Sequence, residues 1–283
     1  MQLSFMSQHL QKLPKLDVQP ESVTELNIFD NQFADFPQEA LAMIELQTLN
    51  ISVNEISAIP NTIDNLKKLT NIDFGHNQLS ALPESFFQLT NLEDYCYLHN
   101  NKLSIIDAAI GNLNKIKYLN LSENQLATLP ETIGQLQKLL ELRIMENKLT
   151  VLPPQLGECS ELRELYLNKN QLTMLPETIG QLQKLRVLMV ENNQLTTFSD
   201  GILQLNSLQR LSFRFNQINE IPTGISQLQN LIELDLRSNN ITTLPETVLQ
   251  LKALKRLDLR WNHDLVAPTW IEQLEARGCV VYL

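Results

Sequence analysis

The chain has 283 residues, of which 43% are hydrophobic, 6% aromatic and 19% charged. Its 22 basic and 32 acidic side chains give a net charge of -10, which argues against a protein that coats DNA or RNA. No apolar run approaches the roughly 20 residues that a membrane-spanning helix needs. The first residues lack the basic and apolar segments of a signal peptide. We therefore expect a cytoplasmic protein, with export by a leaderless route, or a leader missing from this sequence, as the alternative.

A 23-residue repeat runs through the chain and predicts its elements in order. Residues 1–22 match an incomplete first coil, residues 23–253 are regular repeats, and residues 254–283 are a last coil with a C-terminal cap. Three consecutive repeats read IKYLNLSENQLATLPETIGQLQK, LLELRIMENKLTVLPPQLGECSE and LRELYLNKNQLTMLPETIGQLQK. We number the positions of the consensus, LxxLxLxxNxLxxLPxxIxxLxx, from 1 to 23. We expect one domain of about twelve coils.

Each part of the repeat has a structural explanation. Positions 4 and 6 form the buried side of a short strand, so positions 3, 5 and 7 point the other way. The asparagine at position 9 turns the chain out of the strand and can pair backbone groups that would otherwise be buried alone. The proline at position 15 is suited to begin a short helical segment. One coil cannot bury its apolar side alone, but stacked coils share a continuous core.

These repeats resemble those of the leucine-rich-repeat family, on the strength of the LxxLxLxxNxL and LPxxIxxL segments. The 23-residue variety is similar to that of bacterial leucine-rich-repeat proteins and of the intracellular Ras-group repeat proteins. The resemblance implies an α/β solenoid, a right-handed superhelix shaped as a horseshoe arc. A parallel β-sheet would line its concave side, and short helices or 3₁₀ turns its convex side.

Four local features depart from the regular pattern. The coil that starts at Leu92 has 24 residues; we expect Cys96 and Leu98 in its core, with the extra residue as a bulge within 91–94. If Tyr95 and Tyr97 were buried there instead, their rings would overfill these positions.

Asp107 and Ser199 replace the proline at position 15, and we expect looser turns there. Near the C-terminus we expect a helix over 269–277 that ends at Gly278, followed by a last strand over 280–283.

Solenoids usually bind on the concave sheet, so the outward positions carry the candidate site. Eight apolar or aromatic residues fall there over six consecutive coils, and Tyr and Met are favoured in interface cores. The plainer interpretation is that these side chains stabilise the sheet through contacts with side chains on neighbouring strands. These residues are Tyr95, Tyr97, Tyr118, Met145, Tyr166, Val187, Met189 and Phe215.

Charges on the same face change sign along the chain. Arginines stand at position 7 (Arg214, Arg237 and Arg260) and at position 3 (Arg210 and Arg256). They interleave with Glu233, Asp235 and Asp258, so they form either a salt-bridge lattice or a site for an acidic segment of a partner. Acidic residues dominate the earlier coils, and such a gradient would orient a partner and speed its encounter. They are Glu25, Asp30, Asp73, Glu123, Glu141, Glu146 and Glu164.

Catalysis has little support in the sequence. His76 and His99 lie near Asp73, but they are exposed repeat positions with nothing to orient them, so we predict no metal site. No phosphate-binding, zinc-protease or nucleophile-elbow motif is present, and we expect no cofactor. Cys96, Cys159 and Cys279 lie too far apart for a CxxC pair and are expected to be small buried residues.

We therefore predict a non-enzymatic module that binds a protein partner on its concave face. The predicted contacts are Tyr95, Tyr97, Tyr118, Met145, Tyr166, Met189, Arg214, Phe215, Arg237 and Arg260. No nucleic acid and no membrane span are expected. Two alternatives remain: the recognition part of a larger enzyme or effector, and a surface or structural protein that self-associates weakly through the open edges of the solenoid.

Overall fold

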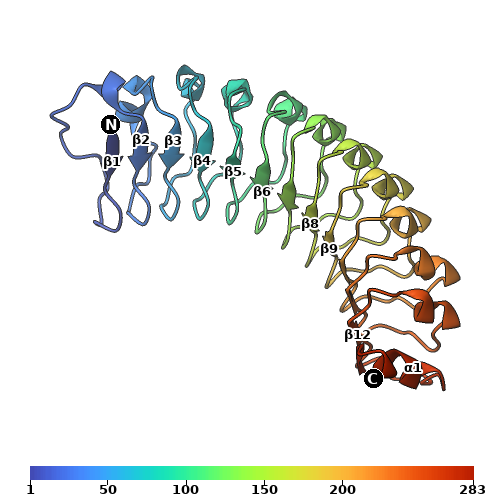
Figure 1. The fold of residues 1–283 in the computed structure, drawn as a ribbon. Coiled ribbons are helices and arrows are strands. Elements are labelled where there is room, and N and C mark those ends of the chain that lie inside the picture. The colour runs from blue at the N-terminus through green and yellow to red at the C-terminus, as the bar shows by residue number, and fades with distance from the viewer. The chain divides into compact units, whose positions relative to one another are not determined.

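The computed structural model describes residues 1–283, and its contacts divide the chain into two compact units, Met1–Arg143 and Ile144–Leu283. In each unit, three-residue strands lie on one side of the coils and short helices on the opposite side (Figure 1). We call the outward surface of the strands the strand face. A solenoid with parallel strands and short 3₁₀ helices is confirmed in both units, and each unit is described by itself.

The first unit contains seven strands and six 3₁₀ helices. The strands are β1 (Gln2–Ser4), β2 (Glu25–Asn27), β3 (Thr48–Asn50), β4 (Asn71–Asp73), β5 (Tyr95–Tyr97), β6 (Tyr118–Asn120) and β7 (Glu141–Arg143). The 3₁₀ helices are η1 (Pro20–Ser22), η2 (Gln38–Ala42), η3 (Ile63–Asn65), η4 (Glu84–Gln88), η5 (Ala108–Asn112) and η6 (Glu131–Gln135).

The second unit contains six strands, five 3₁₀ helices and one α-helix. The strands are β8 (Glu164–Tyr166), β9 (Val187–Met189), β10 (Arg210–Ser212), β11 (Glu233–Asp235), β12 (Arg256–Asp258) and β13 (Val280–Tyr282). The helices are η7 (Pro154–Glu158), η8 (Glu177–Gln181), η9 (Asp200–Gln204), η10 (Thr223–Gln227), η11 (Glu246–Gln250) and α1 (Ile271–Ala276). The predicted C-terminal helix and last strand are confirmed; β13 makes a thirteenth strand beside β12. No helix is both long enough and apolar enough to cross a membrane.

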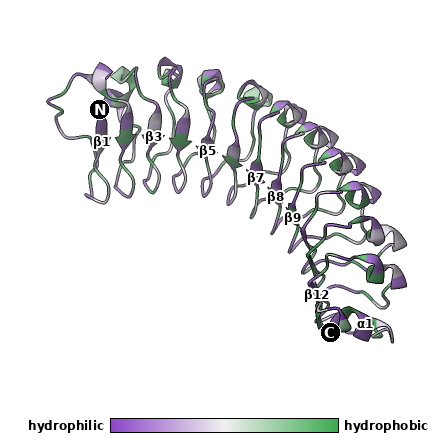
Figure 2. Ribbon diagram, in the orientation of Figure 1, coloured by the Kyte–Doolittle hydropathy of each residue, from purple (hydrophilic) through white to green (hydrophobic).

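The core of each unit is built from the consensus leucine positions. Neighbouring strands pair in parallel so that position 4 of one coil meets position 4 of the next, as Leu26 with Leu49 and Leu211 with Leu234. These side chains are buried, and hydrophilic and hydrophobic stretches are interspersed along the coils (Figure 2). The three cysteines are also buried, as expected, and burial raises the pKa of the Cys159 thiol to about 12.

The asparagines at position 9 form a ladder of backbone hydrogen bonds. In one rung, the Asn77 amide donates to the carbonyls of Ile51, Phe74 and Gly75 at 3.0 to 3.2 Å, and its oxygen accepts from the Ile56 amide at 3.0 Å. The predicted role of this asparagine is confirmed. Equivalent bonds involve Asn31, Asn54, Asn101, Asn124, Asn170, Asn193, Asn216, Asn239 and Asn262.

Most of the 3₁₀ helices begin directly after the proline at position 15, as at Pro83 and Pro130. The expectation that Asp107 and Ser199 loosen this turn was wrong. The Asp107 carboxylate accepts from the Ala109 amide at 2.7 Å, and the Ser199 hydroxyl accepts from the Gly201 amide at 3.3 Å. Both side chains therefore cap their helices, because Asp and Ser can satisfy an amide that has no partner within the helix.

The irregular coil has the predicted register. Cys96 and Leu98 are fully buried, whereas Tyr95 and Tyr97 are only partly so. The extra residue lies at Glu93 and Asp94: the Lys117 amide of the next coil donates to both of their carbonyls, at 2.8 and 3.3 Å, where a regular coil offers one. A bulge absorbs the additional residue here, and the strand that follows keeps its parallel pairing.

Position 8 of every complete coil adopts a left-handed backbone conformation without glycine. Val53 has φ 55° and Asn192 has φ 54° at equivalent places. A β-branched residue is strained in this region, whereas asparagine tolerates it. The sequence alone did not indicate this strain.

We expect Val53→Asn to stabilise the protein by about 1 kcal/mol and Asn192→Val to destabilise it by about the same amount. The two changes exchange the same residue types at the same backbone conformation, so each serves as the control for the other. Urea unfolding followed by circular dichroism measures both free energies. Changes of the same sign in the two variants would contradict the explanation by backbone strain.

Candidate partner-binding surfaces

Three tyrosines surround an open hollow on the strand face of the first unit. The rings of Tyr95 and Tyr97, two residues apart on β5, are stacked with centroids 4.9 Å apart and planes at 29°. Tyr118 on β6 pairs in register with Tyr95 and is 38% exposed. The hollow encloses about 490 Å³. We call it the tyrosine hollow; it is lined by Asp94, Tyr95, Tyr97, His99, Tyr118, Leu119, Asn120, Glu141 and Arg143.

His99 forms one end of this hollow. Its ring meets that of Tyr97 edge to face, with centroids 6.2 Å apart, and that of His76 in the same way at 4.8 Å. The ring lies against the backbone of Gly75: a Cβ atom at this glycine would come within 2.3 Å of His99 Cε1. Glycine at this position therefore leaves the space that the imidazole occupies next to the chain after β4. Burial lowers the pKa of His99, which keeps the ring neutral at pH 7.

The rim of the tyrosine hollow is acidic. Glu141 is ion-paired with Arg143, and Asp94 lies 3.1 Å from the Lys117 ammonium. Asp73 pairs in register with Tyr97 across β4 and β5. The pKa of Tyr97 is raised, first by burial and then by the charge of Glu141; the charge of Arg143 opposes this shift, and that of Asp73 adds to it.

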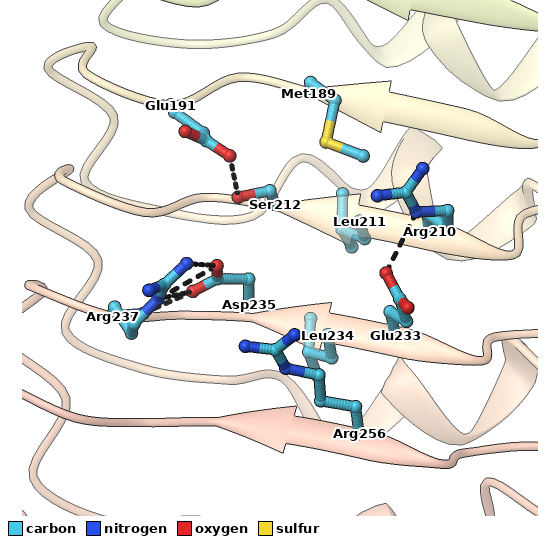
Figure 3. A pocket seen from close by; sticks show the side chains of 10 residues that line it. All are labelled: Met189, Glu191, Arg210, Leu211, Ser212, Glu233, Leu234, Asp235, Arg237 and Arg256. Carbon is cyan, nitrogen blue, oxygen red and sulfur yellow. Dashed lines mark hydrogen bonds and ion pairs between the residues drawn. The ribbon is translucent and has the colours of Figure 1, made fainter. Parts of the chain in front are cut away.

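The second unit presents the remaining predicted apolar residues. Met145 and Tyr166 are partly buried, and the Tyr166 hydroxyl donates to Glu164 at 2.6 Å. Met189, one of the predicted contacts, is only 9% exposed, and so is Val187. Met189 instead lines a smaller hollow of about 170 Å³ beside Arg210 and Leu211 (Figure 3).

Four arginines on the strand face of the second unit are ion-paired with carboxylates: Arg210, Arg237, Arg256 and Arg260. Arg210 donates to Glu233 at 2.9 Å, and Arg237 forms a two-pronged ion pair with Asp235 (Figure 3). Asp258 is fully buried, and Arg260 and Arg256 donate to it at 2.7 and 3.2 Å. We call these residues and their neighbours the arginine cluster, made of Arg210, Arg214, Arg237, Arg256, Arg260, Glu191, Glu233, Asp235 and Asp258.

Arg237, one of the predicted contacts at an outward position, is largely covered by its neighbours. Its side chain is only 16% exposed, and its Nε also lies 3.5 Å from Asp258. Of the two interpretations of these arginines, the salt-bridge lattice therefore accounts for Arg237 and Arg260. Sequence position alone missed this because it places a side chain on a face without showing how its neighbours cover it.

Arg214 differs from the other arginines of the cluster, since it forms no ion pair and its Nε is buried without a hydrogen-bond partner. Its guanidinium lies 4.5 Å from the ring centroid of Phe215, which is exposed. Arg260 stacks on the exposed rings of Tyr282 and Trp261, at 4.8 and 5.4 Å.

Comparison with known proteins identifies the family. A family model described as "Leucine-rich repeat region" matches residues 92–215, and one described as "Leucine rich repeat" matches residues 21–79 and 206–263. A solved leucine-rich-repeat protein of Leptospira interrogans is 30% identical, with a TM-score of 0.70; the match covers 97% of this chain and 82% of that one. The chain belongs to the leucine-rich-repeat family.

Two structures solved as complexes are also similar to this leucine-rich-repeat chain. A plant peptide hormone receptor, RGFR1 in complex with RGF2, is 28% identical with a TM-score of 0.84; the match covers 100% of this chain and 47% of that chain. The Drosophila Toll–Spatzle complex, at 23% identity and a TM-score of 0.75, shares the fold; the match covers 92% of this chain and 40% of that chain. No curated protein sequence matches the chain.

Leucine-rich-repeat domains are generally protein–protein interaction modules, and the fold is typically a non-enzymatic scaffold. Sequence analysis overlooked three residues of the surfaces described above: His99 as part of the tyrosine hollow, and Trp261 and Tyr282 beneath Arg260. Arg260 and Trp261 occupy the adjacent positions 7 and 8 of the last coil, and this adjacency in sequence could have indicated their contact. The contact with Tyr282 depends on the pairing of β13 with β12.

Proposed function

We propose that this chain binds a protein partner on the strand face of its first unit, with the tyrosine hollow as the centre of the contact. The observation that carries the proposal is the clustering of Tyr95, Tyr97 and Tyr118 around one open hollow on two neighbouring strands. The core beneath these strands is already filled by Cys96, Leu98 and the consensus leucines. The tyrosine rings are therefore not needed to complete it.

Tyrosine is well suited to this task. Its large ring contributes contact area with few rotatable bonds, and tyrosine is enriched among the residues that dominate binding energy. The structures of RGFR1 with RGF2 and of Toll with Spatzle, each solved as a complex, support a binding role for such repeats.

The second unit offers a further contact surface of its own. Arg214 has no carboxylate partner and stacks on the exposed ring of Phe215, so this pair is available to an acidic segment of a partner. Met145 and Tyr166 extend the candidate surface on this unit. Arg237 and Arg260 support the surface by their pairing with Asp235 and Asp258 rather than by direct contact.

The proposal is tested by affinity capture from lysate and medium of the source cells. Wild type is compared with a Tyr97→Ser, Tyr118→Ser double variant and with Met174→Ser as the control. Met174 is 62% exposed and lies outside the strand face. Because hot-spot residues contribute about 2 kcal/mol or more, we expect the double variant to bind the captured partner at least about 30-fold more weakly.

Circular dichroism and thermal unfolding of all three proteins establish that the variants are folded. A partner retained by wild type and by Met174→Ser but lost by the double variant supports the strand-face site. A partner retained equally by all three proteins contradicts it. Recovery of the chain alone, with a mass that rises with concentration, would favour self-association.

A further inference from the structure

We propose that the tyrosine hollow accepts a positively charged side chain, lysine or arginine, from an extended segment of the protein partner. This inference rests on the proposed function and specifies the chemistry that the site recognises. It is carried by two features that coincide: the tyrosine rings and an excess of carboxylates around them.

The rings supply the surface on which a cation binds. The face of an aromatic ring is electrostatically negative and attracts an ammonium or guanidinium group within about 6 Å of its centroid. Tyr95 and Tyr97 are stacked at 4.9 Å, and Tyr118 stands beside Tyr95 on the next strand. Several rings therefore border one hollow. Its volume of about 490 Å³ accommodates a long side chain together with the backbone that carries it.

The surrounding charge selects a cation over an anion. The cationic side chains at the rim are already paired: Lys117 with Glu93 and Asp94, and Arg143 with Glu141. Other carboxylates on the strand face of this unit form no ion pair, namely Glu25, Asp30, Asp73 and Glu123. The strand face around the hollow thus has an excess of negative charge.

The tyrosines themselves register this negative field. The pKa of Tyr95 is raised, first by burial and then by the charge of Asp73, with Glu25 and Asp94 contributing in the same direction. His99 adds no positive charge at pH 7, since burial lowers its pKa. A phosphate or a carboxylate brought into the hollow would be repelled, whereas a basic side chain would be attracted.

The experiment titrates the full chain with two capped peptides, Gly-Ser-Gly-Arg-Gly-Ser-Gly and the same peptide with citrulline in place of arginine. Citrulline keeps the shape of arginine but carries no charge. Ring carbon and proton NMR signals of the five tyrosines are followed in protein labelled at tyrosine, and Tyr282 in the second unit is the internal reference. A third peptide with lysine compares the two cations.

We expect the arginine peptide to shift the signals of Tyr95, Tyr97 and Tyr118 and to bind about 5- to 30-fold more tightly than the citrulline peptide. Tyr97→Leu keeps an apolar side chain but lacks the ring, and should lose most of this preference. Tyr97→Phe, which retains the ring face, should keep it. Asp73→Asn should weaken binding of the arginine and lysine peptides while leaving the citrulline peptide unchanged.

Equal binding of the arginine and citrulline peptides would overturn the proposal. An arginine preference that survives in folded Tyr97→Leu would also overturn it, because carboxylates alone would then explain the effect. If Tyr97→Leu fails to fold, the arginine and citrulline peptides are still compared on the wild-type chain. That comparison and the tyrosine signal shifts then decide whether the hollow prefers a cation. A partner lost by the Tyr97→Ser, Tyr118→Ser variant without any arginine preference would leave the proposed function standing and this inference refuted.

Discussion

Replacing Asp258 with asparagine is expected to destabilise the protein by about 3 kcal/mol. The carboxylate is fully buried and accepts from Arg260 at 2.7 and 2.9 Å and from Arg256 at 3.2 Å. Arg237 lies 3.5 Å away. Asparagine fills the same volume but removes the charge that three guanidinium groups share. Breaking a buried pair costs about 3–5 kcal/mol, and partial exposure of the arginines places this case at the lower end.

Tryptophan fluorescence during urea unfolding measures this effect locally. The two tryptophans of the protein, Trp261 and Trp270, lie in the same C-terminal region as Asp258. Asp264→Asn is the matched control, because it makes the same chemical change at an exposed carboxylate. Equal stability of the Asp258→Asn and Asp264→Asn variants would show that the buried carboxylate is not the group that holds the arginine cluster together.

The same carboxylate is expected to make stability depend on pH. Burial by itself raises the pKa of Asp258, but hydrogen bonds from Arg260 and Arg256 and the charge of Arg237 outweigh it, so the pKa lies below its ordinary value. A lowered pKa stabilises the folded state above the unfolded-state pKa of about 4, and this contribution is lost as the pH falls through the folded-state value. The stability difference between wild type and Asp258→Asn should therefore shrink between pH 5 and pH values below about 3. A difference that is constant over this range would contradict the assignment.

Replacing Asn77 with alanine is expected to destabilise the protein by about 3 kcal/mol. One side chain pairs the carbonyls of Ile51, Phe74 and Gly75 and the amide of Ile56. Alanine would leave the Ile56 amide and some of these carbonyls buried without partners, and each such group costs about 1–3 kcal/mol. Water cannot replace the bonds readily because Asn77 is almost entirely buried.

Gln78→Ala is the control for this change. Gln78 follows Asn77 directly but is exposed, and its backbone amide still bonds to the Ile56 carbonyl after substitution. Urea unfolding followed by circular dichroism should show a large loss for Asn77→Ala and a change within about 0.5 kcal/mol for Gln78→Ala. Similar losses in both variants would mean that the asparagine ladder contributes little beyond the turn itself.

The irregular coil shows how far sequence reasoning reaches in this fold. A count back from Asn101 assigns Cys96 and Leu98 to the core, and the structure confirms this assignment. The count succeeds because the asparagine must stay beneath the turn, so the extra residue can be accommodated only before the strand. The same reasoning failed at Asp107 and Ser199, where their known tendency to cap helices was not weighed against the missing proline.

The candidate site was predictable only in part. Sequence positions place Tyr95, Tyr97 and Tyr118 on the strand face, and the structure places them there around a hollow. The sequence positions do not show that neighbouring side chains cover Met189 or that Asp235 holds Arg237 in an ion pair. These outcomes depend on how side chains on neighbouring strands fill the space above the sheet, and those neighbours are about one repeat apart in sequence.

The sequence by itself determined the architecture of this protein, because each coil repeats the same local requirements: buried leucines at fixed positions, an asparagine that pairs the turn, and a residue that starts a 3₁₀ helix. The tertiary structure alone decided which outward residues remain available. Parallel pairing sets residues from successive coils about 4.8 Å apart, close enough for arginines to neutralise carboxylates and for aromatic rings to stack. Exposure and charge on the strand face therefore follow from contacts between coils, which the pattern within one coil does not specify.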